Sequence, residues 1–303
     1  MRKYTLRQLD AFIEVARDQS VSRAAQRLNV TQPAVSMQLR QLEQAVGVPL
    51  VQAEGRAIRL TPAGEEFQAL ALRALAQLKD IDDAFDGRRS LRRGTVDLAV
   101  VSTAKYFIPM LLVAFRRKHP GIDVKLALHN REGVLELLMR NEIDLVVMGR
   151  APEAPANLAE AFATNPMGIV AAPSHALSRR RRSPLSILKE QEFVVREQGS
   201  GTRAAMERLF AAQRIKPRIA MEMPSNETIK QAVMAGMGLS FLSLRTVRHE
   251  LAAGRLVLLD IEGLPLLRHW YVTHRANKRL SPAALAFRQF LVAEGGPLLD
   301  TWC

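Results

Sequence analysis

Apolar residues recur at helical spacing in three stretches near the start of the chain. The stripes are Leu6, Leu9, Phe12, Ile13 and Ala16; Val21, Ala24, Ala25 and Leu28; and Val35, Leu39, Leu42 and Val46. This spacing places the apolar side chains of each stretch on one face of a helix. The pattern therefore predicts three short amphipathic helices that share a core.

The second and third helices are separated only by Asn29-Val30-Thr31. Thr31 is a favourable N-cap, and Pro33 falls in the first helical turn, where its missing N–H costs nothing. Gly47 follows the last apolar residue and supplies a stop. Two helices joined by so tight a turn form a helix-turn-helix.

The third helix carries polar side chains on the face that its apolar stripe leaves open: Gln32, Ser36, Gln38 and Arg40. In a helix-turn-helix, the first residues of the second helix enter the DNA major groove. Glutamine can bond adenine at two points, serine can donate or accept, and arginine can reach phosphate or guanine. The alternative is a small three-helix domain with a solvated polar face.

Residues 50–60 place Glu54-Gly55-Arg56 between two short apolar runs. This pattern predicts a β-hairpin, or wing, with Arg56 at its tip and Arg59 nearby for phosphate groups. Thr61-Pro62 then begins a new helix. The wing favours DNA binding over the solvated alternative.

A long, mostly polar helix is predicted over residues 62–86. Its sparse apolar residues follow heptad a and d positions: Phe67, Ala71, Ala74, Leu78, Ile81 and Phe85. So thin a stripe suits the seam of a homodimer, parallel or antiparallel, and the alternative is a helix lying on the chain's own second domain. A dimer would present two heads to a pseudo-palindromic operator in double-stranded DNA. The polar residues 87–94 are interpreted as a solvated linker.

Residues 96–149 and 193–243 repeat one order of elements: strand, hydroxyl loop, helix, strand, Asn-led helix, strand. Such units predict parallel sheets with right-handed crossovers, so two copies predict two similar lobes. A connection near 163–166 and a late strand at 269–272, followed by a helix at 282–293, indicate a return to the first lobe. The expected domains are residues 1–60, 61–90 and 91–303, with lobe I at 91–162 and 268–303 and lobe II at 163–267.

Ligands of such sheets bind at the carboxyl ends of the strands. The hydroxyl loops and the Asn-led helices meet at that edge, where helix N-termini favour an anion. The predicted ligand-binding residues are Ser102, Thr103, Lys105, Asn130, Arg150, Ser200, Gly201, Thr202 and Asn226; Arg131, Arg196 and Arg203 lie near the same edges. Plain helix capping is the alternative for the hydroxyl and amide residues, and a solvated face is the alternative for the basic ones.

The net charge of +13 suggests an anionic partner but does not locate it. Residues 1–60 hold nine Lys/Arg against five Asp/Glu, whereas residues 91–303 hold 30 against 19. No long apolar run or signal peptide is seen, and the single cysteine is Cys303. We therefore expect a cytoplasmic protein that neither enters a membrane nor forms an intrachain disulfide.

Catalytic and metal motifs are missing from the sequence. The six histidines show no metal-ligand spacing, no Gly-x-Ser-x-Gly occurs, and no nucleophile is paired with a base. We therefore expect no enzyme activity, no metal and no cofactor. Two other classes remain as alternatives: a small-molecule enzyme on a two-lobed α/β scaffold, and a solute-binding transport component.

The sequence resembles the LysR-type transcriptional regulators in Ala24-Ala25, in "TQPAVS" at 31–36, in Leu39/Leu42-Glu43 and in "LTPAG" at 60–64. The resemblance implies a winged helix-turn-helix, a long linker helix and an effector domain of two Rossmann-like lobes, of periplasmic-binding-protein type. It also implies DNA contacts at Thr31, Gln32, Pro33, Ser36, Arg40 and Arg56, and a homotetramer. The chain departs from the family at Val51 and Ala53, where an aromatic and a basic residue are usual.

Within that family, "STAKYF" at 102–107, "NRE" at 130–132 and "MGR" at 148–150 are similar to the regulators of Calvin-cycle (RuBisCO) operons. This resemblance implies an effector that is a phosphorylated metabolite or NADPH. An aromatic or sulfur anion is the alternative effector.

Overall fold

The computed structural model describes residues 4–54, 57–86, 94–152 and 157–302. The chain divides into two compact units, a smaller one within residues 1–83 and a larger one that takes up most of the chain from residue 84 onward. Each unit is described by itself. Within the described ranges, no helix is both long and apolar enough to cross a membrane.

The smaller unit begins with the three predicted helices, α1 (Leu6–Asp18), α2 (Val21–Arg27) and α3 (Gln32–Val46). Their apolar faces meet in one core, whose buried members are Leu9, Ala11, Phe12, Val15, Ala24, Ala25, Val35, Leu39, Leu42, Leu50 and Ala71. Asn29 takes a left-handed φ of 54° in the turn between α2 and α3. The predicted helix-turn-helix is confirmed.

The limits of α3 follow from the residues that flank it. Thr31 has extended backbone, Pro33 lies in the first turn, and Gly47 ends the helix with a φ of 92°. The wing follows as antiparallel strands β1 (Val51–Glu54) and β2 (Ala57–Leu60). Glu43 at the end of α3 fixes the start of the wing, because its Oε1 accepts the Leu50 and Val51 N–H groups at 2.8 and 3.1 Å. Arg56, the predicted wing tip, lies outside the described residues.

Helix α4 (Pro62–Asp86) corrects the prediction of a dimer seam that runs along the whole stripe. Ala71 is 4% exposed within the core of the smaller unit, and Phe67 packs edge-on against Phe12 with ring centroids 5.4 Å apart. The first part of the stripe therefore serves the chain's own core. Ala74 is exposed, and Leu78 is partly buried. The side chains of Ile81 and Phe85 lie outside the description.

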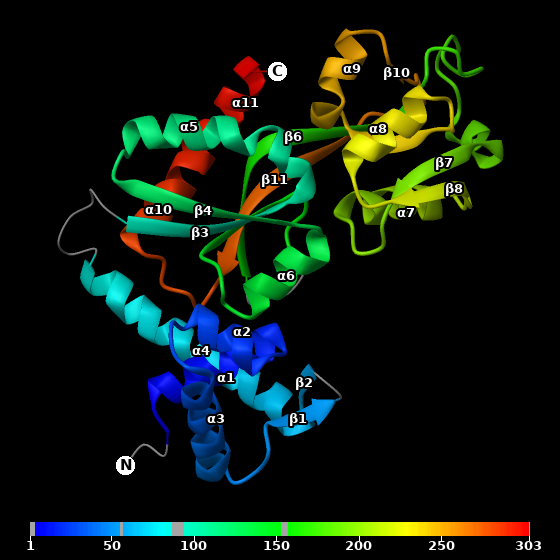
Figure 1. The fold of residues 1–303 in the computed structure, drawn as a ribbon. Coiled ribbons are helices and arrows are strands. Elements are labelled where there is room, and N and C mark those ends of the chain that lie inside the picture. The colour runs from blue at the N-terminus through cyan, green and yellow to red at the C-terminus, as the bar shows by residue number, and fades with distance from the viewer. Residues whose placement is uncertain (1–3, 55–56, 87–93, 153–156, 303) are drawn as a thin grey trace. The chain divides into compact units, whose positions relative to one another are not determined.

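The larger unit is built on a mixed sheet with the strand order β10-β6-β11-β5-β3-β4, and β9 pairs with β6 as well. The strands of the first lobe are β3 (Gly94–Val101), β4 (Ile122–His129) and β5 (Leu145–Met148), all parallel. Two long antiparallel strands, β6 (Asn157–Ala171) and β11 (Leu266–Arg275), run from this lobe into the other (Figure 1). The predicted lobe limits at 162/163 and 267/268 fall inside these two strands.

The second lobe repeats the first, as predicted. Its strands are β7 (Glu192–Arg196) and β8 (Arg218–Met223), which are parallel, then β9 (Ser240–Ser243) and β10 (Val257–Leu258), both antiparallel to β6. Its helices are α7 (Gly201–Ala212), α8 (Asn226–Met234) and α9 (Arg248–Ala252). Short 3₁₀ turns η2 (Leu185–Glu190) and η3 (Leu244–Thr246) complete it.

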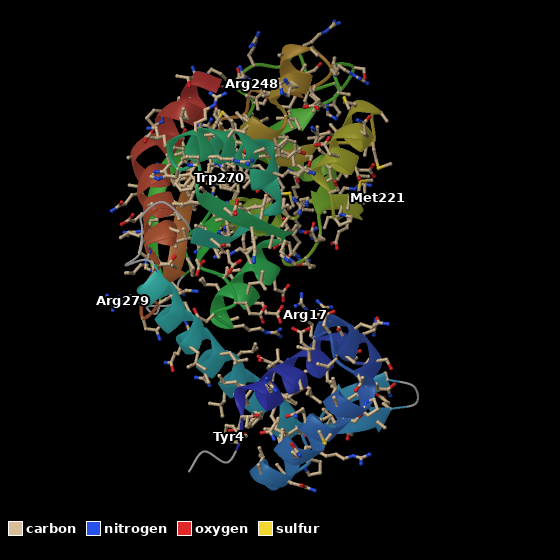
Figure 2. The ribbon with its side chains drawn as sticks, turned by 60° about the vertical axis from the view of Figure 1, so that its left-hand side comes forward. Tyr4, Arg17, Met221, Arg248, Trp270 and Arg279 are labelled. Atoms are coloured by element: carbon tan, nitrogen blue, oxygen red, sulfur yellow. The ribbon has the colours of Figure 1, made fainter. Side chains whose placement is uncertain are left out.

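The first lobe is completed by helices from both ends of the larger unit. They are α5 (Ile108–Lys118), α6 (Arg131–Met139), α10 (Pro282–Phe290) and α11 (Gly296–Trp302), with 3₁₀ turn η1 (Ser102–Tyr106) after β3. Trp270 on β11 is 1% exposed in the core of this lobe (Figure 2). The chain winds through a π-helical segment, η4 (Leu291–Gly295), and into α11, so the helical region extends beyond the predicted end at 293. The two-lobed architecture is confirmed.

Candidate DNA-binding surface and effector pocket

The outer face of α3 forms a shallow groove. Its lining residues are Gln32, Pro33, Ser36, Met37, Arg40, Gln41 and Gln44. Four of the predicted DNA-binding residues are among them, and Thr31 is exposed just before the helix. Gln38 is half-buried at the flank instead. Met37, Gln41 and Gln44 were missed, although their spacing from Pro33 and Arg40 places them on the same helical face.

Replacing Gln32 or Ser36 by alanine is expected to weaken binding to operator DNA about tenfold while changing binding to random DNA by less than about twofold. The reason is that these short polar side chains serve base edges, whereas random DNA is held through phosphates. Competition binding at a fixed salt concentration measures both affinities. Gln213→Ala, at an exposed site in the larger unit, is the control. An equal loss on both DNAs would contradict base reading.

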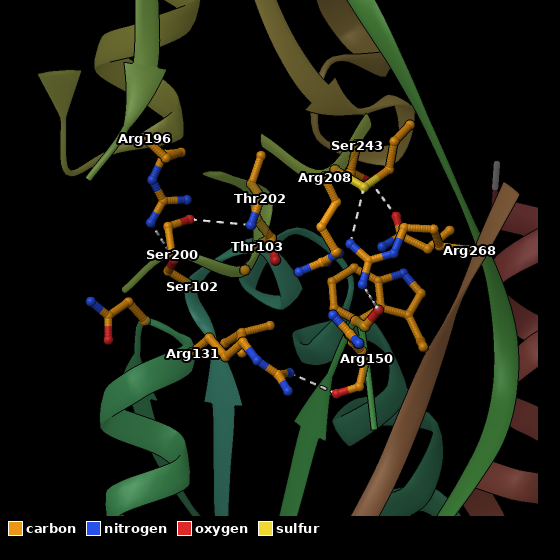
Figure 3. A pocket seen from close by; sticks show the side chains of 17 residues that line it. Ser102, Thr103, Arg131, Arg150, Arg196, Ser200, Thr202, Arg208, Ser243 and Arg268 are labelled. Atoms are coloured by element: carbon orange, nitrogen blue, oxygen red, sulfur yellow. Dashed lines mark hydrogen bonds between the residues drawn. The ribbon is translucent and has the colours of Figure 1, made fainter. Parts of the chain in front are cut away.

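A pocket lies between the two lobes, at the carboxyl ends of β3, β5 and β7 (Figure 3). Seven predicted residues line it: Ser102, Thr103, Asn130, Arg150, Ser200, Gly201 and Thr202. Arg131 and Arg196 also line it, and eight further residues were missed: Val101, Gly149, Asn165, Met167, Arg208, Ser243, Arg268 and Trp270. The free volume is only about 30 Å³, room for roughly two water molecules.

Asn226 does not line the pocket but holds an arginine that does. Its Oδ1 accepts a hydrogen bond from Arg196 Nη1 at 2.6 Å. Arg196 is 3% exposed, and it also donates to Ser102 Oγ at 3.0 Å and to both carboxylate oxygens of Glu197 at 2.7 and 2.9 Å. Because Ser102 belongs to lobe I and Arg196 to lobe II, this arginine connects the lobes across the pocket.

Lys105, predicted in the site, is not among the lining residues; its ammonium lies 5.3 Å from the centre of the Tyr106 ring. The Tyr106 hydroxyl donates to the Glu227 carboxylate of lobe II. Buried Lys230 pairs with Glu227 at 3.0 Å and with Glu250 at 2.9 Å. Burial alone would raise the pKa of Glu227, but hydrogen bonds from Tyr106 and Lys230 outweigh it and lower that pKa. These side chains form a second connection between the lobes.

Helix capping accounts for part of the predicted set. Asn130 Oδ1 accepts the Gly133 N–H at 3.0 Å, and Ser200 Oγ accepts the Thr202 N–H at 3.3 Å. Both residues therefore cap helices and also face the pocket. Arg203, which lay near the same edge in sequence, does not line it: its guanidinium pairs with Glu207 at 2.6 Å and with Glu222 at 3.5 Å.

The pocket concentrates positive charge. Its described lining contains five arginines, namely Arg131, Arg150, Arg196, Arg208 and Arg268, and no carboxylate. Arg131 Nη1 donates to the Arg150 carbonyl at 2.7 Å, and Arg268 Nη2 donates to the Gly149 carbonyl at 2.7 Å. Burial, and then the charges of three neighbouring arginines, lower the pKa of Arg268 to about 10. Arg268 therefore stays charged at neutral pH, but at a cost that a bound anion would relieve.

Four of the missed pocket residues lie on two strands that are not part of the predicted repeat. Asn165 and Met167 lie on β6, and Arg268 and Trp270 lie on β11. The Trp270 indole N–H is buried and finds no hydrogen-bond partner among the described residues. Hydroxyl, amide and indole groups thus surround the arginines, an arrangement that suits a small, multiply charged oxyanion.

Two family models match the chain in tandem. Residues 6–65 match the bacterial regulatory helix-turn-helix of the lysR family, and residues 89–296 match the LysR substrate binding domain. The first match contains α1–α3 and the wing, and the second contains both lobes.

Curated relatives extend over nearly the whole chain. The RuBisCO operon transcriptional regulator of Allochromatium vinosum is 45% identical over 291 residues, covering 96% of each chain. The transcriptional regulator CbbR of Rhodospirillum rubrum is 47% identical over 288 residues, covering 95% of this chain and 96% of its own. These relatives are transcriptional regulators rather than enzymes.

Solved structures agree in fold. The Synechocystis PCC6803 CcmR regulatory domain, in complex with 2-PG, is 40% identical with a TM-score of 0.64, covering 66% of this chain and 97% of its own. Full-length CbnR complexed with its target DNA is 25% identical with a TM-score of 0.67, covering 95% and 98%. This chain, with its helix-turn-helix and its two-lobed domain, belongs to the LysR family of DNA-binding transcriptional regulators.

Proposed function

We propose that this regulator binds a compact phosphorylated anion between its lobes, and that binding changes the arrangement of its DNA-binding heads on the operator. The observation that carries the proposal is the lining of the pocket, with five arginines and no carboxylate among the described residues. Guanidinium groups bind phosphate and carboxylate oxygens at two points, so this lining suits a ligand that carries a phosphate together with a second acidic group. The proposed regulator works in the cytoplasm and needs no cofactor besides this effector.

The pocket is nearly filled by its own side chains. Because its free volume is only about 30 Å³, any effector would have to displace lining side chains or the two lobe-to-lobe connections. A compact phosphorylated acid would need a smaller rearrangement than NADPH. The complex of the related CcmR domain with 2-PG supports this class.

The proposed assembly is a homodimer through residues 62–86 that pairs further into a tetramer. Because Phe67 and Ala71 are used in the chain's own core, the seam would rest on other residues of α4, such as Leu70, which is 51% exposed, and Ala74. Further contacts between copies would use apolar side chains on the edge strands β4 and β8. These side chains are Leu126, Leu128, Ile219 and Met221, all of which are exposed. Met221 is labelled in Figure 2. Exposed apolar edges of this kind are typical of surfaces that pair.

Thermal melting of the purified protein across a metabolite panel tests the effector class. The panel contains 2-phosphoglycolate, phosphoenolpyruvate, ribulose bisphosphate, NADPH, aromatic acids and sulfate, with a simple polyanion as a charge control. At 100 times its dissociation constant, the effector should add about 2.7 kcal/mol to the free energy of unfolding. We expect one compact phosphorylated acid to produce this shift.

Two pocket variants locate the effect. Ser102→Ala and Thr202→Ala are expected to keep operator affinity but to move the ligand dose curve to higher concentration, because each loses a hydroxyl group at the pocket. Thr228→Ala, at an exposed position on α8, is the matched control. An unchanged dose curve in both pocket variants would refute the site, and a response only to an aromatic or sulfur anion would refute the phosphorylated class.

A further inference from the structure

Met37 is an exposed apolar residue on an otherwise polar surface of α3. Its side chain is 51% exposed, although it lies in the middle of a helix whose other apolar residues form the core. It lines the groove together with Gln32, Ser36 and Arg40. Met37 is not a member of the core of its own unit, so the fold does not account for an apolar side chain at this position.

The direction of Met37 follows from helix geometry. At 100° per residue, Met37 points about 170° away from the middle of the core stripe formed by Val35, Leu39 and Leu42. Gln32 and Ser36 lie nearer the side of the helix. Gln44, two turns later, points in nearly the same direction and lines the same groove. Because the first residues of the second helix enter the major groove, Met37 is the one of these two side chains that would lie nearer the base pairs.

We propose that Met37 is a specificity-determining residue that recognises the C5-methyl group of a thymine. The major groove offers hydrogen-bonding groups and one apolar group, the thymine methyl. A methionine can neither donate nor pair with a charge, but its long unbranched side chain can cover a methyl group. The role rests on DNA binding by α3 and adds an apolar contact beside the polar contacts of Gln32 and Ser36.

The test asks whether the effect of the Met37 side chain on DNA affinity depends on one particular thymine methyl group. The full-length protein first selects a preferred duplex from a random pool. Each thymine of that duplex is then replaced by deoxyuridine, which removes only the methyl group, and dissociation constants are measured for wild type and Met37→Ala. At one thymine of each half-site, the replacement should weaken binding by wild type about fourfold. This factor corresponds to about 0.8 kcal/mol, the contribution of one buried aliphatic carbon group.

Met37→Ala should bind the thymine duplex about fourfold more weakly and be indifferent to deoxyuridine at that same position. Met139→Ala, at a methionine that is 66% exposed in the larger unit, should behave as wild type throughout. The proposal is wrong if the losses of binding free energy caused by Met37→Ala and by removal of the methyl group simply add at every thymine. It is also wrong if Met37→Ala alters only self-association. If the pool yields no preferred duplex, sequence-specific DNA binding itself fails, and the role of Met37 fails with it.

Discussion

Replacing Arg268 by methionine is expected to lower effector affinity at least 100-fold while leaving the ligand-free protein as stable as wild type or more stable. Arg268 lies in the pocket with three other arginines whose charges, after burial, hold its pKa near 10. That pKa is below the value for a free arginine, so the fold disfavours its charge at every pH below about 10. Removing the charge relieves the repulsion, and methionine keeps much of the side-chain volume.

The two effects are separated by measuring them on one variant. Calorimetric titration gives the effector affinity, and thermal melting without ligand gives the stability. Arg181→Met, in an exposed loop of lobe II, is the control and should change neither. If Arg268→Met binds the effector as tightly as wild type does, Arg268 does not contribute to effector binding. A large fall in ligand-free stability would show that its bond to the Gly149 carbonyl outweighs the repulsion.

Replacing Gly64 by alanine is expected to unfold the smaller unit, at a cost of at least about 3 kcal/mol. Gly64 lies in the first turns of α4, and a Cβ placed there would be 1.9 Å from the Leu50 carbonyl oxygen. Because that oxygen belongs to the backbone between α3 and the wing, no side-chain rotation relieves the clash. The helix or the wing must move.

Operator binding should therefore be lost in Gly64→Ala, while the effector still stabilises the larger unit. Hydrogen exchange of α1–α3 and effector titration measure the two outcomes separately. Gly47→Ala is the matched control, since that glycine has a φ of 92° but a Cβ placed there would meet no atom within 4 Å. It should cost only about 1–2 kcal/mol, the price of a left-handed alanine. Wild-type operator binding by Gly64→Ala would contradict the packing of α4.

The sequence was most informative where one local rule decided the structure. The helix-turn-helix could be predicted because Thr31, Pro33 and Gly47 mark the ends of a helix whose apolar stripe is unambiguous. The two lobes could be predicted because Ser102 and Ser200 follow strands in the same order of elements. Neither inference needed knowledge of distant contacts.

Prediction failed where one residue pattern fits two structures. Heptad spacing in α4 cannot say whether Phe67 meets a partner helix or the ring of Phe12. Asn165-Pro166 has the composition of a turn and falls in the predicted connection near 163–166, yet it lies inside the long strand β6, so the pocket residues of β6 were missed. Lys105 was assigned by its position near a strand end, whereas its ammonium lies over Tyr106.

Energy transfer between the two ends of an operator duplex, bound by the full-length protein, tests the central claim most directly. The compact phosphorylated acid found by thermal melting is titrated into the complex. The account predicts a saturable change in the distance between the DNA ends, with a midpoint at the ligand's dissociation constant, and no change in Arg268→Met. A ligand that saturates the pocket of wild type without changing that distance would contradict the account.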